Sequence, residues 1–265
     1  MQPLTLNAAD ISVWVGRLWW PVLRIGGFAL SAPAFSEATI PSLVKIFLSV
    51  TLAFLMAPLA HVPAALSIFS AAGMLAAVQE VLIGVAIGMV VQLAFEALNF
   101  AGQSISLTMG LGFATLVDPQ RGANTTALGQ LFMIFGTLLY LAINGHLVLI
   151  GALAQSFGTL PVGGGSVGGN FLLSVVMWGG RVFQSGLLIA LPAVIALVIV
   201  NLALGVVTRA APQLNLFGIG FTITLMCGFF VLTVGLDGLM SGIRSLIDSS
   251  LAAATELVRA PAGAH

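Results

Sequence analysis

The sequence of 265 residues is so poor in charge that it excludes several classes of protein. Charged residues make up 6% of the chain and hydrophobic residues 59%, and the mean hydropathy is +1.15. A soluble domain is roughly a quarter charged, and a disordered chain combines low hydrophobicity with high charge. The formal net charge is zero, so the chain lacks the basic footprint of a nucleic-acid-binding protein. An integral membrane protein is the class that remains.

Long intervals without charged residues divide the chain into candidate helices. No Asp, Glu, Lys or Arg occurs between Lys45 and Glu80, or between Arg121 and Arg181. A helix that crosses a bilayer needs about 20 apolar residues, and the absence of alternating polarity argues against a barrel. We therefore expect an all-α integral membrane protein built from helical hairpins. Its six long helices are expected at about residues 11–33, 42–60, 71–101, 124–154, 171–208 and 215–257.

The first expected helix carries two arginines. Arg17 and Arg24 are seven residues apart and therefore lie on one side of that helix. An arginine inside an apolar helix usually faces protein or water rather than lipid. We expect both side chains to be turned away from lipid.

A glycine-rich stretch at residues 101–121 predicts a break after the third helix. Gly102, Gly110 and Gly112 permit unusual backbone dihedrals. Non-helical backbone at membrane depth is tolerated only inside protein or beside a cavity. The stretch is therefore a candidate pore-lining or plugging loop, and an ordinary packed connection is the alternative. The side chains that would form a deformable apolar seal are Met109, Leu111 and Phe113.

The next helix is expected to start just after this stretch. Asp118 suits an N-cap and Pro119 suits the first helical position. Arg121 can pair with Asp118 or with a partner protein. Two more breaks follow, at residues 156–170 and 209–215, and the second is short enough to join an antiparallel hairpin.

Polar and small residues recur every fourth position in the third helix, which places neighbours in the series close together on its surface. Those residues are Glu80, Gly84, Gly88, Gln92 and Glu96. Gly84 and Gly88 form a small-xxx-small pattern that favours close helix packing. A glutamate within the membrane suggests a function such as proton transport. The alternative is a glutamate that bonds to a neighbouring subunit or lies above the membrane. Asn201 is expected to hold helices together through hydrogen bonds.

Catalysis is not expected. His61 and His146 lack the spacing of a metal site, and no serine sits in a nucleophile–base signature. We expect neither a metal nor a cofactor. A self-contained secondary transporter that uses its intramembrane glutamates stays open as an alternative, and so does a structural subunit with no pore surface.

Three stretches carry a resemblance to a known family. The first comprises Gly102-Gln103, Met109-Gly110-Leu111-Gly112-Phe113-Ala114 and Asp118-Pro119-Gln120. The second is Asn144-Gly145-His146-Leu147-Val148-Leu149-Ile150, continuing to Ser156-Phe157 and Leu160-Pro161-Val162-Gly163. The third comprises Leu191-Pro192-Ala193, Val200-Asn201-Leu202-Ala203-Leu204-Gly205 and Arg209-Ala210-Ala211-Pro212-Gln213-Leu214-Asn215-Leu216-Phe217-Gly218-Ile219-Gly220-Phe221. In order and spacing they resemble the FliR/SctT family of type III export-gate proteins, over nearly the whole chain. The details are more similar to the flagellar than to the virulence members.

The resemblance implies a fold and a set of partners. One copy would complete a helical, ring-like gate with several copies of FliP and FliQ homologues. Residues 1–170 would form a FliP-like part with a plug loop at about 102–121, and residues 171–257 a FliQ-like hairpin. The plug would lie at residues 109–114. Packing against helices or subunits would involve Glu80, Gly84, Gly88, Gln92, Glu96, Asn201 and Pro212.

The resemblance also implies a function and a location. The gate would conduct unfolded flagellar subunits across the bacterial inner membrane at the flagellar basal body, with part of its helices on the periplasmic side. The FlhA and FlhB families would be cytoplasmic neighbours, and some surface would contact lipid. Energy would come from a separate ATPase and the proton motive force.

Overall fold

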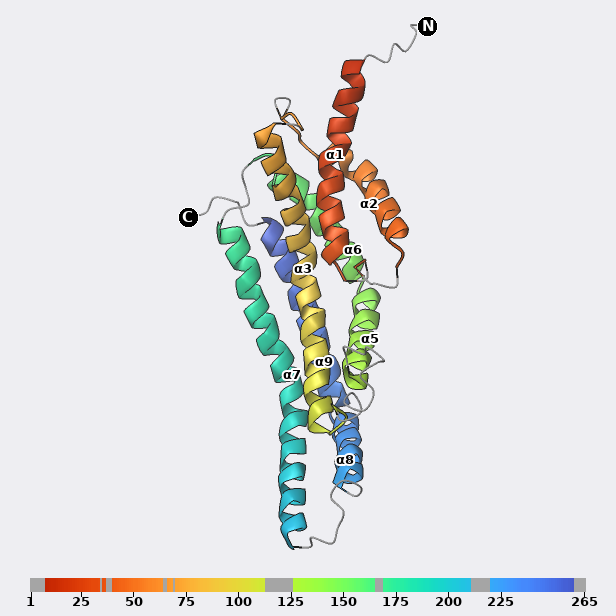
Figure 1. Ribbon diagram of the computed structural model, residues 1–265, viewed down its shortest axis with the longest axis vertical. Coiled ribbons are helices and arrows are strands. Elements are labelled where there is room, and N and C mark those ends of the chain that lie inside the picture. The colour runs from red at the N-terminus through yellow and green to blue at the C-terminus, as the bar shows by residue number, and fades with distance from the viewer. Residues whose placement is uncertain are drawn as a thin grey trace. The chain divides into compact units, whose positions relative to one another are not determined.

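The computed structural model describes residues 8–33, 35–36, 40–63, 66–68, 70–112, 126–164, 169–210 and 220–259. In these ranges the chain forms eight α-helices and one short 3-10 helix, and it contains no strand (Figure 1). The expected all-α fold class is therefore confirmed. The helices are α1 (Ala8–Ser31), α2 (Ser42–Met56), η1 (Ala57–Leu59), α3 (Ala71–Thr108), α5 (Ala127–Ala142), α6 (Gly145–Thr159), α7 (Gly169–Ala210), α8 (Phe221–Val234) and α9 (Leu236–Arg259).

Two of the six expected helices are each divided in the structure. The helix expected at 124–154 is divided into α5 and α6 at Asn144, whose φ of 57° and ψ of 30° are left-handed. Asparagine is one of the few residues that adopt this conformation readily. The helix expected at 215–257 is divided into α8 and α9 at Gly235, a residue type that weakens a helix interior.

The helical pattern continues further in α3 than the sequence suggested. The break expected from residue 102 begins only after Thr108, so the prediction for residues 102–108 was wrong. A methyl group built on Gly102 would lie 2.7 Å from the Gly129 backbone in α5. This glycine therefore permits close helix packing instead of interrupting the helix. The hydroxyls of Ser104 and Thr108 donate back to carbonyls four residues earlier, an arrangement that polar residues adopt inside helices.

Several helices are long and apolar enough to cross a membrane. Within the described residues, three qualify by themselves, and up to five qualify if each bent pair, α5 with α6 and α8 with α9, counts as one span. Most of the apolar stretch of α3 is buried within the chain, whereas the stretches in α2 and α7 are mostly exposed. The apolar surface of α3 is therefore used for packing inside the protein.

Packing divides the chain into two compact units, each built from separate segments. The first unit contains Met1–Gln92, Asn144–Gly179 and Ser250–His265, and the second contains Leu93–Ile143 and Gly180–Ser249. The first unit thus includes α1, α2, α6 and the beginning of α3, and the second includes α5, α8 and the end of α3. The division expected at residue 170 separates a FliP-like part from a FliQ-like hairpin on the basis of resemblance. The two packing units describe a different property of the chain, so that division stays a prediction.

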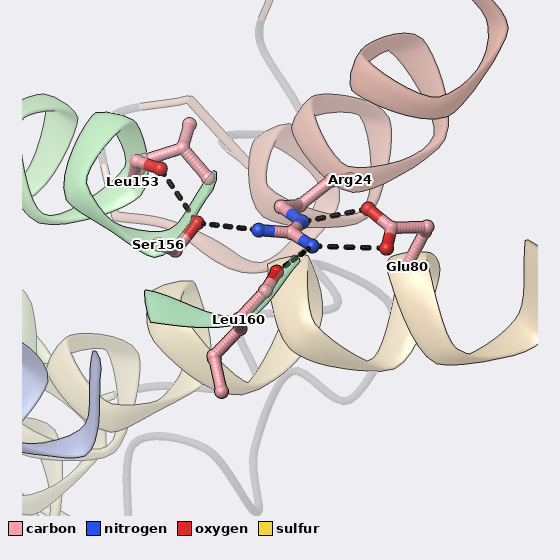
Figure 2. A network of polar contacts seen from close by, with 5 residues as sticks. All are labelled: Arg24, Glu80, Leu153, Ser156 and Leu160. Atoms are coloured by element: carbon pink, nitrogen blue, oxygen red, sulfur yellow. Dashed lines mark hydrogen bonds and ion pairs between the residues drawn. The ribbon is translucent and has the colours of Figure 1, made fainter. Parts of the chain in front are cut away.

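A buried arginine forms a network of polar contacts in the first unit (Figure 2). Arg24 in α1 is fully buried, and its guanidinium forms a bidentate ion pair with Glu80 of α3. Its Nε donates to Glu80 Oε2 at 2.7 Å, and its Nη2 donates to Glu80 Oε1 at 2.9 Å. Such paired hydrogen bonds match the planar guanidinium to the planar carboxylate. The expectation that Arg24 faces protein is confirmed.

The same guanidinium also binds the end of α6. Its Nη1 donates to Ser156 Oγ at 3.0 Å, and its Nη2 donates to the Leu160 carbonyl at 2.8 Å. The ring of Phe157 lies with its centroid 4.4 Å from Arg24 Cζ, a cation–π distance. One buried charge therefore connects α1, α3 and α6, and its hydrogen bonds offset part of the cost of removing both ions from water.

Two glycines allow α3 to approach α1 closely. A methyl group built on Gly84 would lie 2.8 Å from Phe28 N and would also meet the Arg24 carbonyl. A methyl group on Gly88 would lie 2.7 Å from Ala32 N. The atoms that either added methyl group would meet include backbone atoms. Backbone atoms cannot move aside as the end of a flexible side chain can. Within the first unit, this side of α3 therefore accepts no larger residue at either position.

The ion pair gives a prediction about stability. Arg24→Met should lower the free energy of unfolding by about 3–5 kcal/mol, because it leaves the buried Glu80 carboxylate without its partner. The double variant Arg24→Met with Glu80→Met should recover much of that loss. Denaturant titration of the purified full chain in mild detergent measures both effects.

The exposed pair Arg244 and Asp248 of α9 supplies the control, since these side chains lie 3.7 Å apart and are more than half exposed. Arg244→Met should cost at most about 1 kcal/mol. A double variant whose loss equals the sum of its two single losses would show that Arg24 and Glu80 are not energetically coupled.

The glycine contact gives a second prediction. Gly84→Ala should destabilise the chain by about 1–3 kcal/mol, because the added methyl group overpacks a backbone contact. Gly158→Ala in α6 is the matched control, since a methyl group there meets nothing within 4 Å. The control should be neutral or stabilising by up to about 1 kcal/mol through helix propensity. Equal unfolding midpoints for both variants would contradict the close packing at Gly84.

Candidate functional site

The end of α3 is closed by a glycine-dependent turn at residues 109–112, here called the α3 turn. Gly110 has a φ of 82°, its N–H donates to the Leu107 carbonyl, and the N–H of Leu111 donates to the Ser106 carbonyl. These two bonds define a Schellman motif, in which the left-handed residue is usually glycine. A side chain at position 110 would be strained by this φ. The motif ends α3 and redirects the chain just before residues 113–125, which lie outside the described part.

The α3 turn is packed against α8 in the second unit. Met109 is fully buried, and a methyl group built on Gly228 of α8 would lie 2.7 Å from Met109 Cγ and 2.8 Å from its Sδ. A methyl group on Gly110 would lie 3.3 Å from the ring of Phe221. Phe221 and Gly228 are seven residues apart and so lie on one side of α8. Met109 thus holds the turn on this side of α8, while Leu111 and Gly112 are only half-buried.

A side-chain amide adds polar contacts at the same place. Asn201 Nδ2 in α7 donates to the carbonyl of Thr108, the last residue of α3, at 3.1 Å. Asn201 Oδ1 accepts a hydrogen bond from Thr224 Oγ1 in α8 at 3.1 Å. One asparagine of α7 therefore connects the end of α3 to the beginning of α8.

The C-terminal half of α3 is fixed on its other sides as well. A methyl group on Gly136 of α5 would lie 2.6 Å from Leu98 Cδ1, and the rings of Phe95 and Tyr140 meet edge to face at 5.7 Å. A methyl group on Gly186 of α7 would lie 2.7 Å from the Ala97 carbonyl. Within the second unit, α3 is thus held between α5 and α7, and its end is a well-supported base for the chain that follows.

The structure describes only some of the residues that the sequence predicted for the plug and its flank. Met109, Gly110, Leu111 and Gly112 form the α3 turn. The remaining residues lie outside the described part, namely Phe113, Ala114, Asp118, Pro119, Gln120, Arg121 and Pro212. The first described residue of the next helix is Ala127, and its N-cap is Thr126, whose side chain accepts from Gly129 N at 3.2 Å.

The predicted packing residues of α3 are found in different surroundings. Glu80 is the ion-pair partner of Arg24, and Gly84 and Gly88 face α1. Gln92 is half-buried and Glu96 is exposed, and each makes polar or electrostatic interactions of its own. The series therefore does not form one continuous polar contact.

Sequence reasoning missed the partners of these residues. Glu80 and Arg24 were each identified, but their pairing was not, although two buried charges of opposite sign in an almost uncharged chain were a signal. Thr224 and Gly228 were also missed. They are a small residue pair at i, i+4 in the otherwise bulky helix α8, which was the available signal for a packed side.

The comparisons with known proteins agree on one family. The family described as "Bacterial export proteins, family 1" matches residues 15–250. The flagellar biosynthetic protein FliR of Pectobacterium carotovorum subsp. carotovorum is 42% identical over 234 residues, which are 88% of each chain. The FliR protein of Escherichia coli (strain K12) is 41% identical over 235 residues, 88% of this chain and 86% of that one. The FliR protein of Bacillus subtilis (strain 168) is 28% identical over 232 residues, 86% of this chain and 89% of that one.

These matches extend from α1 through most of α9 and include the α3 turn and the buried arginine. Given this coverage and identity, the chain belongs to bacterial export protein family 1, as one of its FliR members, which are membrane proteins of the flagellar export apparatus and not enzymes.

Proposed function

We propose that the chain is the subunit that completes a gated channel for unfolded flagellar subunits in the bacterial inner membrane. Its partners in one complex would be FliP and FliQ homologues, and the FlhA and FlhB families would be neighbours on the cytoplasmic side. Membership of the flagellar export proteins supports this proposal. The resemblance of residues 109–114 to the plug region of export gates supplies the mechanism.

The observation that carries the proposal is the α3 turn. A plug needs a firm base and a movable tip. The base is present here, because Met109 is fully buried against Gly228 and Gly110 closes α3 with a positive φ. The plug would begin at the half-buried Leu111 and Gly112 and continue through Phe113 and Ala114. Small and apolar side chains would exclude ions at rest, and glycines would permit displacement when a substrate arrives.

The fold would be divided by function at about residue 170. Residues 1–170 would be the FliP-like part that carries the plug, and residues 171–257 would be a FliQ-like hairpin. The hairpin is supported by the helix order, since α7 is followed by the bent pair α8 and α9. Asn201 and the flanking Pro212 would then contribute to packing within this hairpin or with its neighbours.

Exposed apolar side chains support assembly with other apolar surfaces. Large exposed patches on a soluble monomer are uncommon and mark contact sites. The α2 residues Leu43, Phe47, Phe54 and Leu55 are between 67% and 74% exposed. We propose that such surfaces face neighbouring gate subunits and lipid, and that part of the helices projects to the periplasmic side at the basal body.

The transporter alternative, which would use Glu80 and Glu96, loses the first of these two candidate residues. Glu80 is 1% exposed, and both of its carboxylate oxygens accept hydrogen bonds from Arg24. A carboxylate engaged in this way is a structural partner of the guanidinium, and breaking the pair is costly. No specific observation favours proton transport through this residue.

Deletion of residues 110–114 tests the proposed plug. In cells that make the deleted chain, ion leak through the inner membrane should rise, because nothing would seal the resting channel. A potential-sensitive dye measures the leak, and the amount of assembled complex is measured in the same membranes.

A deletion of the same length at residues 261–265 serves as the control and should leave the leak at its baseline. If the plug deletion gives an assembled complex with an unchanged leak, the plug assignment is wrong.

A further inference from the structure

We propose that Asn201 is a positioning residue that latches the base of the plug to α7 and α8 while the gate is closed. This inference rests on the proposed function and deepens it, because it names a contact that holds the base of the plug in place. It is carried by three described segments of the second unit. They are the end of α3, the later part of α7 and the beginning of α8.

The amide of Asn201 suits both of its partners. Its NH₂ group donates to the Thr108 carbonyl, which can only accept, and its oxygen accepts from the Thr224 hydroxyl. The other orientation of the amide would set oxygen against oxygen at Thr108. An aspartate of the same shape lacks the donor, and a leucine lacks both functions. The site therefore requires the amide rather than polarity alone.

The carbonyl of Thr108 has no hydrogen-bond donor within α3 and needs one from another segment. The last carbonyls of a helix have no partner in the helix. The carbonyls of Ile105, Ser106 and Leu107 accept hydrogen bonds from the N–H groups of residues 109–111, in the Schellman motif and the turn before it. Thr108 comes next, and Asn201 supplies its donor. The hydrogen bond is thus located where the regular helix ends and the plug begins.

The contact has the properties of a latch that can open. Asn201 is exposed within the chain, and the net strength of one hydrogen bond is modest. The Thr224 hydroxyl also lies 3.0 Å from the Gly220 carbonyl in its own helix. Its single proton can turn to Gly220 when Asn201 leaves. Release therefore leaves the Thr224 hydroxyl with a partner in its own helix.

Loss of the latch should shift the resting gate toward its open state. One hydrogen bond of ordinary strength corresponds to a change of about five- to tenfold in the closed-to-open ratio. Asn201→Leu removes both bonds at similar volume, but the Thr224 hydroxyl can still donate to the Gly220 carbonyl. The net loss is therefore about one hydrogen bond, and resting ion leak should rise by about that factor. Thr224→Val should raise it less, because the Thr108 bond remains. Since both changes act through the Asn201 side chain, the double variant should show less leak than the product of the single effects.

The experiment compares ion leak with the amount of assembled complex in the same membranes, and it also follows export of flagellar subunits. A purely structural role would lower assembly and export, whereas a latch would raise leak while assembly and export are retained. Thr233→Val is the matched control, because it removes a hydroxyl of α8 that bonds only to the carbonyl of Phe229 in its own helix. It should leave the leak unchanged.

Deletion of residues 110–114 in parallel separates the latch from the plug. Raised leak in the deletion, with baseline leak in assembled Asn201→Leu, would overturn the latch and leave the plug intact. Baseline leak in both assembled variants would overturn the proposed function at this site as well. Failure of both Asn201→Leu and Thr224→Val to assemble would also overturn the latch, because it would assign these residues to folding.

Discussion

In a chain with 6% charged residues, a charge that folding buries must find its partner within the protein. Water and lipid cannot supply one inside an apolar bundle, and an unpartnered buried charge is very costly. Arg24 meets this constraint with four hydrogen bonds, to Glu80, Ser156 and the Leu160 carbonyl. These bonds hold α1, α3 and the end of α6 together at one point of the first unit.

The second unit is connected by a neutral polar group instead. Asn201 satisfies a carbonyl at the end of α3 and accepts from a hydroxyl of α8. The two solutions differ in strength, and the difference suits their positions. A buried bidentate ion pair fixes helices permanently, whereas an exposed amide contact beside the α3 turn can be broken and formed again. Helix α3 carries both contacts, the ion pair near its beginning and the amide contact at its end.

Particular residues show which features of the fold could be predicted from the sequence and which could not. Helix content followed from hydropathy and charge gaps, and the need for Gly110 at an unusual backbone angle followed from its residue type. Gly102 was misinterpreted as a helix breaker, because local propensity does not reveal that Gly129 of α5 packs against it. The breaks at Asn144 and Gly235 were missed because apolar composition continues across both. Pairings such as Arg24 with Glu80 depend on residues 56 positions apart, which periodicity does not connect.

The central claim is that the chain acts as one subunit of a hetero-oligomeric export gate, and native mass spectrometry tests it most directly. The tagged full chain would be extracted from its own membrane in mild detergent. The account predicts a large assembly that holds one copy of this chain with several copies of two smaller apolar proteins. A lone chain or a simple homodimer, reproduced in gentler detergents, would contradict the account, because a self-contained protein would have no ring to complete and no shared channel for its plug to close.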